Sequence, residues 1–428
     1  MQILKNPKRD DWKSLLARPE KDLAELHSVV SEVLQKVRAE GDKAVVEYEE
    51  KFDRVRLDSI LVTEDEIREA ESLVSPQLRA AIELAHSNIM KFHEAQKFVG
   101  RKIETSPGVV CWQKAVAIEK VGLYIPGGTA PLFSTVLMLA TPARIAGCGE
   151  IVLCSPPGAD GRLNPAILVA ARVAGVDKIA KCGGVQAIGA MAYGTESVPK
   201  VSKIFGPGNQ YVMAAKQMVS LREVAIHMPA GPSEVAVVAD DSANPVFVAA
   251  DLLSQAEHGA DSQVVLVSPS ERLIGAVASE IERQIELLPR KDIALRSLES
   301  SKLILVSDIS EALDIVNEYA PEHLILAVDN YGEVAEGVVN AGSVFLGNYS
   351  CESAGDYASG TNHTLPTNGY AKAYSGVSLD SFIRKITFQE LTTEGIRSIG
   401  PAVEMMAANE LLDAHRNAMT VRLDSVGR

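Results

Sequence analysis

The chain has few aromatic residues and no surplus of positive charge. Only 5% of its 428 residues are aromatic, and 42 Lys and Arg stand against 56 Asp and Glu, which gives a net charge of −14. Nucleic acids and anionic membranes attract positive surfaces, and single strands are commonly bound on stacked aromatic rings. We therefore expect neither a nucleic acid nor a membrane as a partner.

The chain also lacks the segments that direct a protein into or across a membrane. Its opening stretch, MQILKNPKRDD, contains no apolar core of a signal peptide, and no uncharged apolar run is long enough to span a bilayer. The five cysteines are an odd number and form no Cys-x-x-Cys pair. These features favour a reducing compartment, and we expect a cytoplasmic protein.

What the chain does contain is enough apolar sequence for several domains. Hydrophobic residues make up 46% of it, and a length of 428 residues predicts two or three domains. Residues 21–97 predict helices, because apolar residues such as Leu34 and Val37 recur at helical spacing. Thr63 with Glu66 has the pattern of a capping box at the start of one of these helices.

Strands and helices then alternate in two series, over residues 121–217 and 234–346. Repeated strand–loop–helix units predict a parallel sheet with helices on both faces. The tail from about residue 376 reads mainly as helix. We therefore expect an α/β protein with two Rossmann-like parallel-sheet domains, a helical N-terminal segment and an extended helical C-terminal tail.

The expected boundaries follow these changes of pattern. An N-terminal arm covers residues 1–20, and residues 21–119 together with 232–375 form the first α/β domain. Residues 120–231 form the second α/β domain, and residues 376–428 form the tail. How far the N-terminal helices belong to the second α/β unit stays open at this stage.

Polar side chains that bind metals gather in three segments. Gln255 and His258 stand one helical turn apart at the end of an apolar helical stretch, so both side chains can reach one ion. Residues 352–356 (Glu-Ser-Ala-Gly-Asp) with His363, and residues 413–415 (Asp-Ala-His), supply groups of the same kind. Mixed nitrogen and oxygen ligands without cysteine suit zinc, or manganese and cobalt at the same site.

Glu322 and His323 follow Pro321 and open a predicted strand. A carboxylate beside an imidazole offers a group that activates water and a group that accepts a proton. Neighbouring residues of a strand point to opposite faces, so both can reach one site only if the strand starts irregularly, which Pro321 makes possible. A surface Glu–His pair is the alternative interpretation.

Polar residues also fall where strands end. Tyr124 and Gln186 lie at strand ends or in the loops that follow, and this edge is where ligands bind in open α/β sheets. Residues 206–209 (Gly-Pro-Gly-Asn) lie between a strand and a helix, where N–H groups can approach a pyrophosphate. The full Gly-x-Gly-x-x-Gly is absent because position 211 is Tyr, so an ordinary βα turn explains the string about as well.

Taken together, these strings closely resemble the histidinol dehydrogenase family. The resemblance covers essentially the whole chain in the right order, and six separated motifs carry it. They are DLLSQAEHG (251–259), APEHL (320–324), ESAGDYASGTNH (352–363), GPSE (231–234), GPGN (206–209) and AHRN (414–417). Ala260 stands where many members have proline, and we expect this to matter little.

The resemblance implies oxidation of L-histidinol to L-histidine through L-histidinal, with two NAD⁺ and one zinc ion per subunit. It implies that His323 is the general base and that Glu322 activates water for attack on the aldehyde. The implied zinc ligands are Gln255, His258, Asp356 and His415. The implied contacts with NAD are Tyr124, Gln186 and Asn209. The residues implied to bind the substrate are Ser233, Gln255, His258, His323, Asp356, His363, Glu410 and His415.

The same resemblance implies a homodimer with shared active sites. Residues 120–231 would then be the NAD-binding domain, and the tail of residues 376–428 would cross to the partner. Glu410 and His415 would complete the active site of the neighbouring subunit.

Three other functions fit part of the pattern. A related NAD-dependent dehydrogenase of another small amino alcohol or diol would use the same machinery, but His363, Glu410 and the full ligand set argue against it. A hydrolase with zinc-activated water would leave the loops after the strands unused. A non-catalytic metal-binding or scaffold protein would leave Glu322 and His323 without a role.

Overall fold

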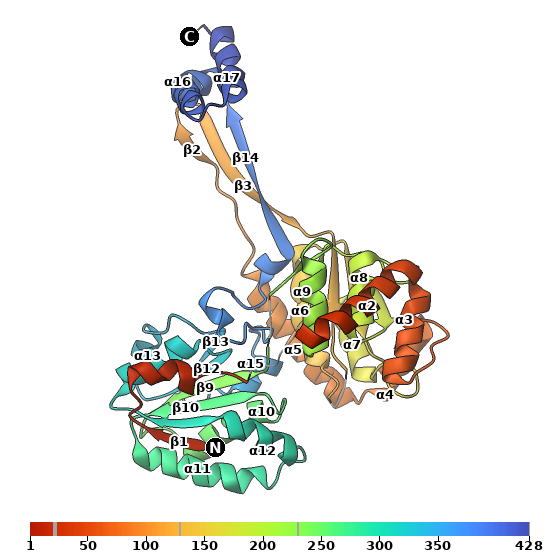
Figure 1. Cartoon of the computed structure of the whole chain (residues 1–428), viewed down its shortest axis with the longest axis vertical. Coiled ribbons are helices and arrows are strands. Elements are labelled where there is room, and N and C mark those ends of the chain that lie inside the picture. Colours follow the sequence, from red (N-terminus) through yellow and green to blue (C-terminus); the bar gives the residue numbers. More distant parts are fainter. Residues whose placement is uncertain (20–23, 128–129, 229–230, 428) are drawn as a thin grey trace.

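A computed structural model of the chain describes residues 1–19, 24–127, 130–228 and 231–427. Two bodies each surround a parallel β-sheet, and an arm of three antiparallel strands projects away from both (Figure 1). We call them the five-stranded body (residues 24–94 and 120–226), the six-stranded body (residues 1–19 and 231–375) and the arm (residues 103–117 and 383–425). The two parallel sheets confirm the expected α/β class.

The five-stranded sheet has the strand order β6-β5-β4-β7-β8, and its neighbouring strands are all parallel. Helices start where the sequence supplies a cap, because the side chains of Asn164 and Asn209 accept N–H groups in the first turns of α7 and α9. In chain order the elements are β4 (Lys120–Tyr124), α6 (Phe133–Ala146), β5 (Glu150–Ser155), α7 (Pro165–Ala174), β6 (Lys178–Lys181), α8 (Gly184–Tyr193), β7 (Lys203–Phe205), α9 (Gln210–Ser220) and β8 (Ala225–Ile226).

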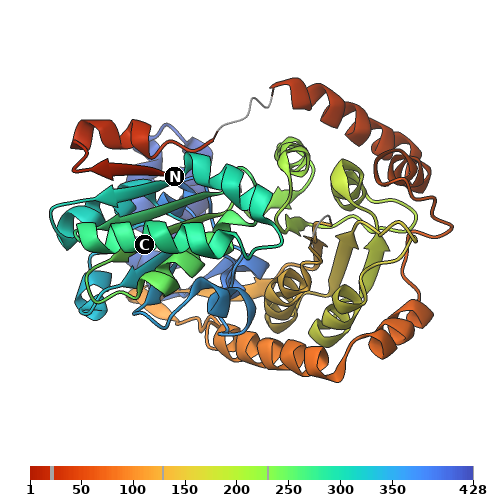
Figure 2. The same cartoon turned by 90° about the horizontal axis from the view of Figure 1, so that it is seen from below.

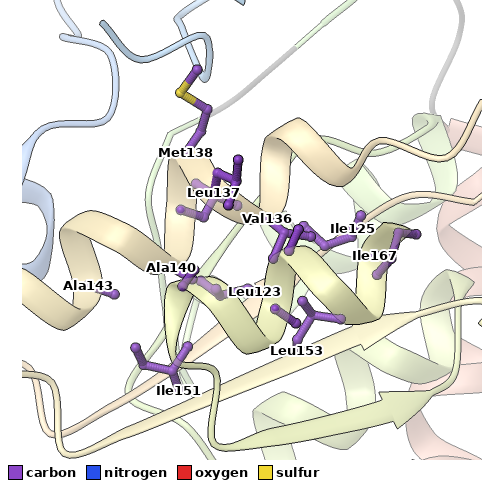
Figure 3. Packing of buried hydrophobic residues seen from close by; sticks show 14 of the residues in the cluster. Leu123, Ile125, Val136, Leu137, Met138, Ala140, Ala143, Ile151, Leu153 and Ile167 are labelled. Carbon is purple, nitrogen blue, oxygen red and sulfur yellow. The ribbon is translucent and has the colours of Figure 1, made fainter. Parts of the chain in front are cut away.

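Helix α6 is packed tightly against this sheet (Figure 3). Leu123 and Ile125, at the end of β4, belong to the same buried cluster as Leu153 of β5, Val136 of α6 and Ile167 of α7. Each fully buried side chain of this kind contributes about 1.5–3 kcal/mol relative to an exposed one. The packing therefore holds the beginning of α6 firmly beside the carboxyl edge of the sheet.

The N-terminal helices cover the five-stranded sheet, which differs from the expected grouping of residues 21–119 with 232–375. Helix α2 packs on α8 and α9, while α4 and α5 pack on α7 and α6. Figure 2 shows the first strand on one body and the helices that follow it around the other. Amphipathic helices require an apolar surface, but their pattern does not specify which sheet supplies it. The helices are α2 (Ala24–Glu40), α3 (Asp42–Tyr48), the π-helical turn η2 (Glu49–Asp53), α4 (Glu64–Leu73), which begins with the expected capping box, and α5 (Pro76–Glu94).

The six-stranded sheet has the order β1-β11-β10-β9-β12-β13, and its neighbouring strands are also parallel. The N-terminal strand β1 forms one edge by pairing with β11. The elements are β1 (Gln2–Lys5), η1 (Arg9–Asp11), α1 (Trp12–Leu15), β9 (Glu234–Ala239), α10 (Pro245–Ala256), β10 (Gln263–Ser268), α11 (Glu271–Ile285), α12 (Lys291–Ser300), β11 (Lys302–Leu305), α13 (Ile309–Tyr319), β12 (His323–Ala327), α14 (Tyr331–Ala335), β13 (Ser343–Leu346), α15 (Glu352–Tyr357) and η3 (Tyr370–Lys372).

The arm consists of β2 (Ile103–Ser106), β3 (Val109–Ala117) and β14 (Ile383–Leu391), and it carries α16 (Thr393–Asn409) and α17 (Asp413–Ser425) at its far end (Figure 1). The turn η4 (Leu379–Phe382) leads into it. We expected the tail to be mainly helical, and the structure differs at β14, which pairs with β3 along its whole length. Almost every residue of β14 is exposed, so the strand carries no alternation of buried and exposed positions.

Candidate active site

Glu322 and His323 lie at the start of β12, inside the six-stranded body. Ala320 has a positive φ of 51°, and this turn lets the strand start irregularly, so that both side chains reach the same place. Glu322 Oε2 lies 3.6 Å from His323 Nδ1, and both residues are buried. The alternative interpretation as a surface pair is therefore wrong.

The main chain of Glu234, the first residue of β9, holds both side chains. Its N–H donates to Glu322 Oε2 at 2.9 Å, and its carbonyl oxygen accepts from His323 Nδ1 at 3.1 Å. Strands β9 and β12 are neighbours in the sheet, which is why one residue can serve both.

Gln255 of α10 and Asp356 of α15 approach His323 from other sides. Gln255 Nε2 lies 2.8 Å from His323 Nδ1, and Asp356 Oδ1 lies 3.4 Å from His323 Nε2. Within the described part of the chain, Gln255 Oε1, His323 Nε2 and Asp356 Oδ1 are buried without a hydrogen-bond partner. Buried polar atoms of this kind call for a ligand, an ion or water.

His258 lies two residues beyond the end of α10 and is exposed. The surrounding protein still lowers the pKa of its ring by desolvation, and the charge of Asp356 opposes this shift while that of His323 adds to it. The structure thus brings Gln255, His258 and Asp356 together in one chain, three of the four residues that the sequence predicts as zinc ligands.

Glu352, the first residue of the candidate segment 352–356, is also a member of the cluster, although the resemblance gives it no role. It is 1% exposed, and its Oε2 has no hydrogen-bond partner among the described residues. The possible ligand atoms of His323, Glu352 and Asp356 all lie within 4.8 Å of one another, an arrangement that could hold a metal ion. The available signal was the spacing of Glu352 and Asp356, which are four residues apart and share a helix face.

The crowding of carboxyl groups shifts the pKa values of the cluster. Burial raises the pKa of Glu322 to about 8, although His323 opposes the shift. Burial alone would lower the pKa of His323, but the charges of Glu352, Glu322 and Asp356 outweigh it and raise this pKa to about 10. Such a surplus of carboxyl groups makes the cluster attractive to a cation.

His363 connects the cluster to the five-stranded body. Its Nδ1 donates to the main-chain oxygen of Asp356 at 2.8 Å, because a carbonyl can only accept. In the neutral ring, Nε2 is then an acceptor, and the hydroxyl of Thr135 donates to it at 3.1 Å. Thr135 is a buried residue in the first turn of α6. The bond joins a predicted substrate-binding residue to the other body.

A cavity of about 1000 Å³ lies at the carboxyl edge of the five-stranded sheet. Tyr124, Gln186 and Asn209, which the sequence predicts to contact NAD, all line it. Clefts of several hundred Å³ up to about 1,000 Å³ are the usual size of cofactor sites. The cavity lies at the sheet edge where the sequence predicts a ligand.

Each of these three side chains is held in place. The Gly184 N–H donates to the hydroxyl oxygen of Tyr124 at 3.2 Å, and Gln186 Nε2 donates to Glu49 Oε1 at 2.7 Å. The side-chain oxygen of Asn209 accepts from two N–H groups at the start of α9, at 3.0 and 3.1 Å.

Glu49 is a buried carboxyl group behind the cavity that the sequence did not reveal. Burial raises its pKa from 4.5 to about 7, although the Gly183 N–H, at 2.8 Å, and Gln186 donate to it. The charge of Asp53, which lines the cavity, adds to the shift.

The other predicted site residues are not all near the cluster. Ser233 is half-buried directly before β9, next to Glu234. Glu410 and His415 are exposed at the junction of α16 and α17, at the far end of the arm (Figure 1). The structure of a single chain therefore does not bring these two residues to the cluster.

The five cysteines are free, and Cys148, Cys154 and Cys182 are buried in the five-stranded body. Among the described residues, no helix is both long enough and apolar enough to cross a membrane.

Comparisons with known proteins agree with the resemblance in the motifs. The family model described as histidinol dehydrogenase matches residues 16–423. The histidinol dehydrogenase of Bacteroides thetaiotaomicron is 68% identical over 426 residues, with 100% of each chain covered. That of Vibrio vulnificus is 53% identical and covers 94% of this chain and 93% of its own. The crystal structure of histidinol dehydrogenase from Elizabethkingia anophelis matches with a TM-score of 0.98 and 55% identity, and covers 100% of this chain and 99% of its own. The chain therefore belongs to the histidinol dehydrogenase family, and it is an oxidoreductase.

Proposed function

We propose that the protein oxidises L-histidinol to L-histidine through L-histidinal, with two NAD⁺ and one zinc ion per subunit, in histidine biosynthesis. The observation that carries this proposal is the buried cluster around His323, which contains polar atoms without a hydrogen-bond partner among the described residues. His363 connects this cluster to Thr135 of the five-stranded body. A base and a carboxyl group that activates water are the parts that a two-step oxidation of an alcohol to an acid requires.

The experiment is a steady-state assay of NADH formation from L-histidinol with zinc-loaded protein. We expect two NADH per histidinol. No NADH from histidinol, with turnover of another amino alcohol or a diol, would support the related dehydrogenase instead. Binding of NAD⁺ at equilibrium separates either dehydrogenase from a zinc hydrolase.

In this proposal His323 accepts the alcohol proton at Nε2 as hydride passes to NAD⁺. The neighbouring carboxylates raise the pKa of the ring, and the charge of a bound zinc ion would oppose this shift and leave the ring neutral. Its Nδ1 donates to the main-chain oxygen of Glu234, while Nε2 has no hydrogen-bond partner among the described residues. Glu322 then takes a proton from water as the water oxygen adds to the aldehyde, and His323 returns its proton to the former carbonyl oxygen. The neutral His323 then deprotonates the hydrate as the second hydride passes to NAD⁺. The two side chains lie close together, with Glu322 Oε2 3.6 Å from His323 Nδ1.

We propose that Gln255, His258 and Asp356 of one chain hold the zinc ion together with His415 of a second chain. The buried, unpartnered Gln255 Oε1 and Asp356 Oδ1 fit a cation, and mixed oxygen and imidazole ligands suit zinc. When bound, zinc supplies a template for the imidazole and amino nitrogens of the substrate.

Zinc content tests this ligand set against the cluster of His323, Glu352 and Asp356. We expect His258→Asn to purify with little zinc and Glu352→Gln to keep it. The opposite result, measured by atomic absorption on folded protein, would assign the ion to Glu352.

We propose that residues 120–231 are the NAD-binding domain and that Tyr124, Gln186 and Asn209 contact the dinucleotide. The cavity that they line and the N-terminus of α9 behind Asn209 support this role. The incomplete glycine pattern predicts weak binding, which isothermal titration with NAD⁺ measures.

We also propose a homodimer in which the tail of residues 376–428 completes the partner's site with Glu410 and His415, while Ser233 and His363 bind the substrate within the chain. Strand β14 has nine residues and is about 30 Å long, so it places α16 that far from the beginning of the strand. This length supports a reach toward another molecule.

We propose the reducing cytoplasm as the location of the protein, because its cysteines are unpaired.

A further inference from the structure

We propose that Arg18, in the N-terminal segment of residues 1–19, is a positioning residue that holds Glu322 and His323 in place through Glu234. The inference rests on the proposed function, since it concerns the two residues proposed to act on the substrate. It assigns a task in the reaction to a segment that lies at the opposite end of the sequence from the cluster.

Arg18 binds Glu234 with both arms of its guanidinium group. Nε donates to Oε1 at 2.5 Å and Nη2 donates to Oε2 at 2.8 Å, and both side chains are largely shielded from solvent. Nη2 also donates to the main-chain oxygen of Tyr319 at 2.7 Å, and the guanidinium group lies 4.1 Å from the centre of the Tyr319 ring. Arg18 therefore ties the start of β9 to the end of α13, just before the turn that leads to Glu322.

Glu234 connects Arg18 to Glu322 and His323. Its carboxylate also accepts from the Asn368 N–H at 2.7 Å, so its side chain is fixed from two directions. Its main-chain N–H and C=O are the groups that bond Glu322 and His323. When the side chain of a residue is locked in this way, its backbone cannot turn without breaking several buried, charge-assisted bonds.

The two catalytic side chains depend on Glu234 to different degrees. His323 is also approached by Gln255 and Asp356. Within the described residues, the N–H of Glu234 is the one hydrogen-bond donor to the Glu322 carboxylate. Release of Glu234 should therefore disturb Glu322 more than His323, and so impair oxidation of the aldehyde more than oxidation of the alcohol.

The test uses Arg18→Lys and Glu234→Gln in the full-length, zinc-loaded protein. Lysine keeps the positive charge beside Glu234, so no buried carboxylate is left unpaired, but it cannot make two parallel bonds. Glutamine keeps the shape and the acceptor for Asn368 but removes the charge. Arg9→Met is the matched control, because Arg9 makes an exposed ion pair with Asp314 of α13 at 3.3 Å, away from Glu234.

The measurement is the single-turnover rate constant for NADH formation from L-histidinal divided by that for the first NADH formed from L-histidinol. A purely structural defect lowers the amount of active enzyme, which cancels in this ratio. We expect the ratio to fall about tenfold in both variants, as for the loss of one hydrogen bond to a charged group, with zinc content and the KM for NAD⁺ unchanged. Arg9→Met should leave the ratio as in the wild type.

An unchanged ratio in folded Arg18→Lys and Glu234→Gln would overturn the inference, and so would an equal fall in Arg9→Met. Failure of the proposed function has a different result, because the wild-type protein would then form no NADH from either compound.

Discussion

Glu49 gives a prediction that links a buried carboxyl group to the pH dependence of stability. Its pKa is raised by burial from 4.5 to about 7, so between these values the unfolded chain binds fewer protons than the folded protein. Stability contributed by this group is therefore complete below about pH 4.5 and is lost as the pH rises toward and beyond 7. The difference between the two pKa values corresponds to about 3 kcal/mol at alkaline pH.

The perturbation is Glu49→Gln, which imitates the protonated acid. The amide oxygen can still accept from the Gly183 N–H and from Gln186, and the amide carries no charge that burial would penalise. We expect the variant to match the wild type near pH 5 and to be more stable near pH 8.5 by about 2–3 kcal/mol. For a chain of this length that is an increase of about 3 °C in Tm.

Thermal unfolding of both proteins at the two pH values, followed by circular dichroism, measures the difference. Glu50→Gln is the matched control, since Glu50 is the exposed neighbour of Glu49 and its variant should follow the wild type at both pH values. A variant of Glu49 that is less stable by the same amount at both pH values would refute the reasoning. It would mean that the two hydrogen bonds keep Glu49 ionised in the folded protein.

Three further predictions concern the proposed reaction. Thr135→Val should raise the KM for histidinol about tenfold, because His363 Nε2 loses its buried donor, while Thr135→Ser should restore it; equal KM values would contradict the link. His323→Asn should abolish turnover with zinc content near normal, and Glu322→Gln should slow aldehyde oxidation more than alcohol oxidation, which separate assays with the two compounds measure. Mixing inactive His415→Ala with inactive His323→Asn should restore part of the activity if the tails are exchanged, and no recovery after subunit exchange would count against a shared site.

The sequence predicted the two parallel sheets well, because their strands are short apolar runs with helices between them. The two predicted series, over residues 121–217 and 234–346, match the runs from β4 to α9 and from β9 to β13 to within three residues at each end. The arm was missed because β14 is exposed over most of its length and pairs with a strand more than 260 residues earlier, which no local pattern records.

The site was predictable where spacing places residues on one face, as for Gln255 and His258. Glu49 and Arg18 were not predicted because their importance comes from partners remote in sequence. Arg18 and Glu234 are 216 residues apart, and Arg18 stands in no recognisable local pattern. Charged residues of this kind resemble ordinary surface residues until the fold brings them together and buries them.

The pairing of β1 with β11 has a consequence for how the protein is made. On the ribosome the first strand emerges about 300 residues before its partner, and the entire five-stranded body is synthesised between them. That body can fold around its own sheet while Gln2–Lys5 is still unpaired at the start of the nascent chain. The residues translated first are thus among the last to be locked into the native structure, and a ribosome that stalls before Lys302 leaves them with no strand to join.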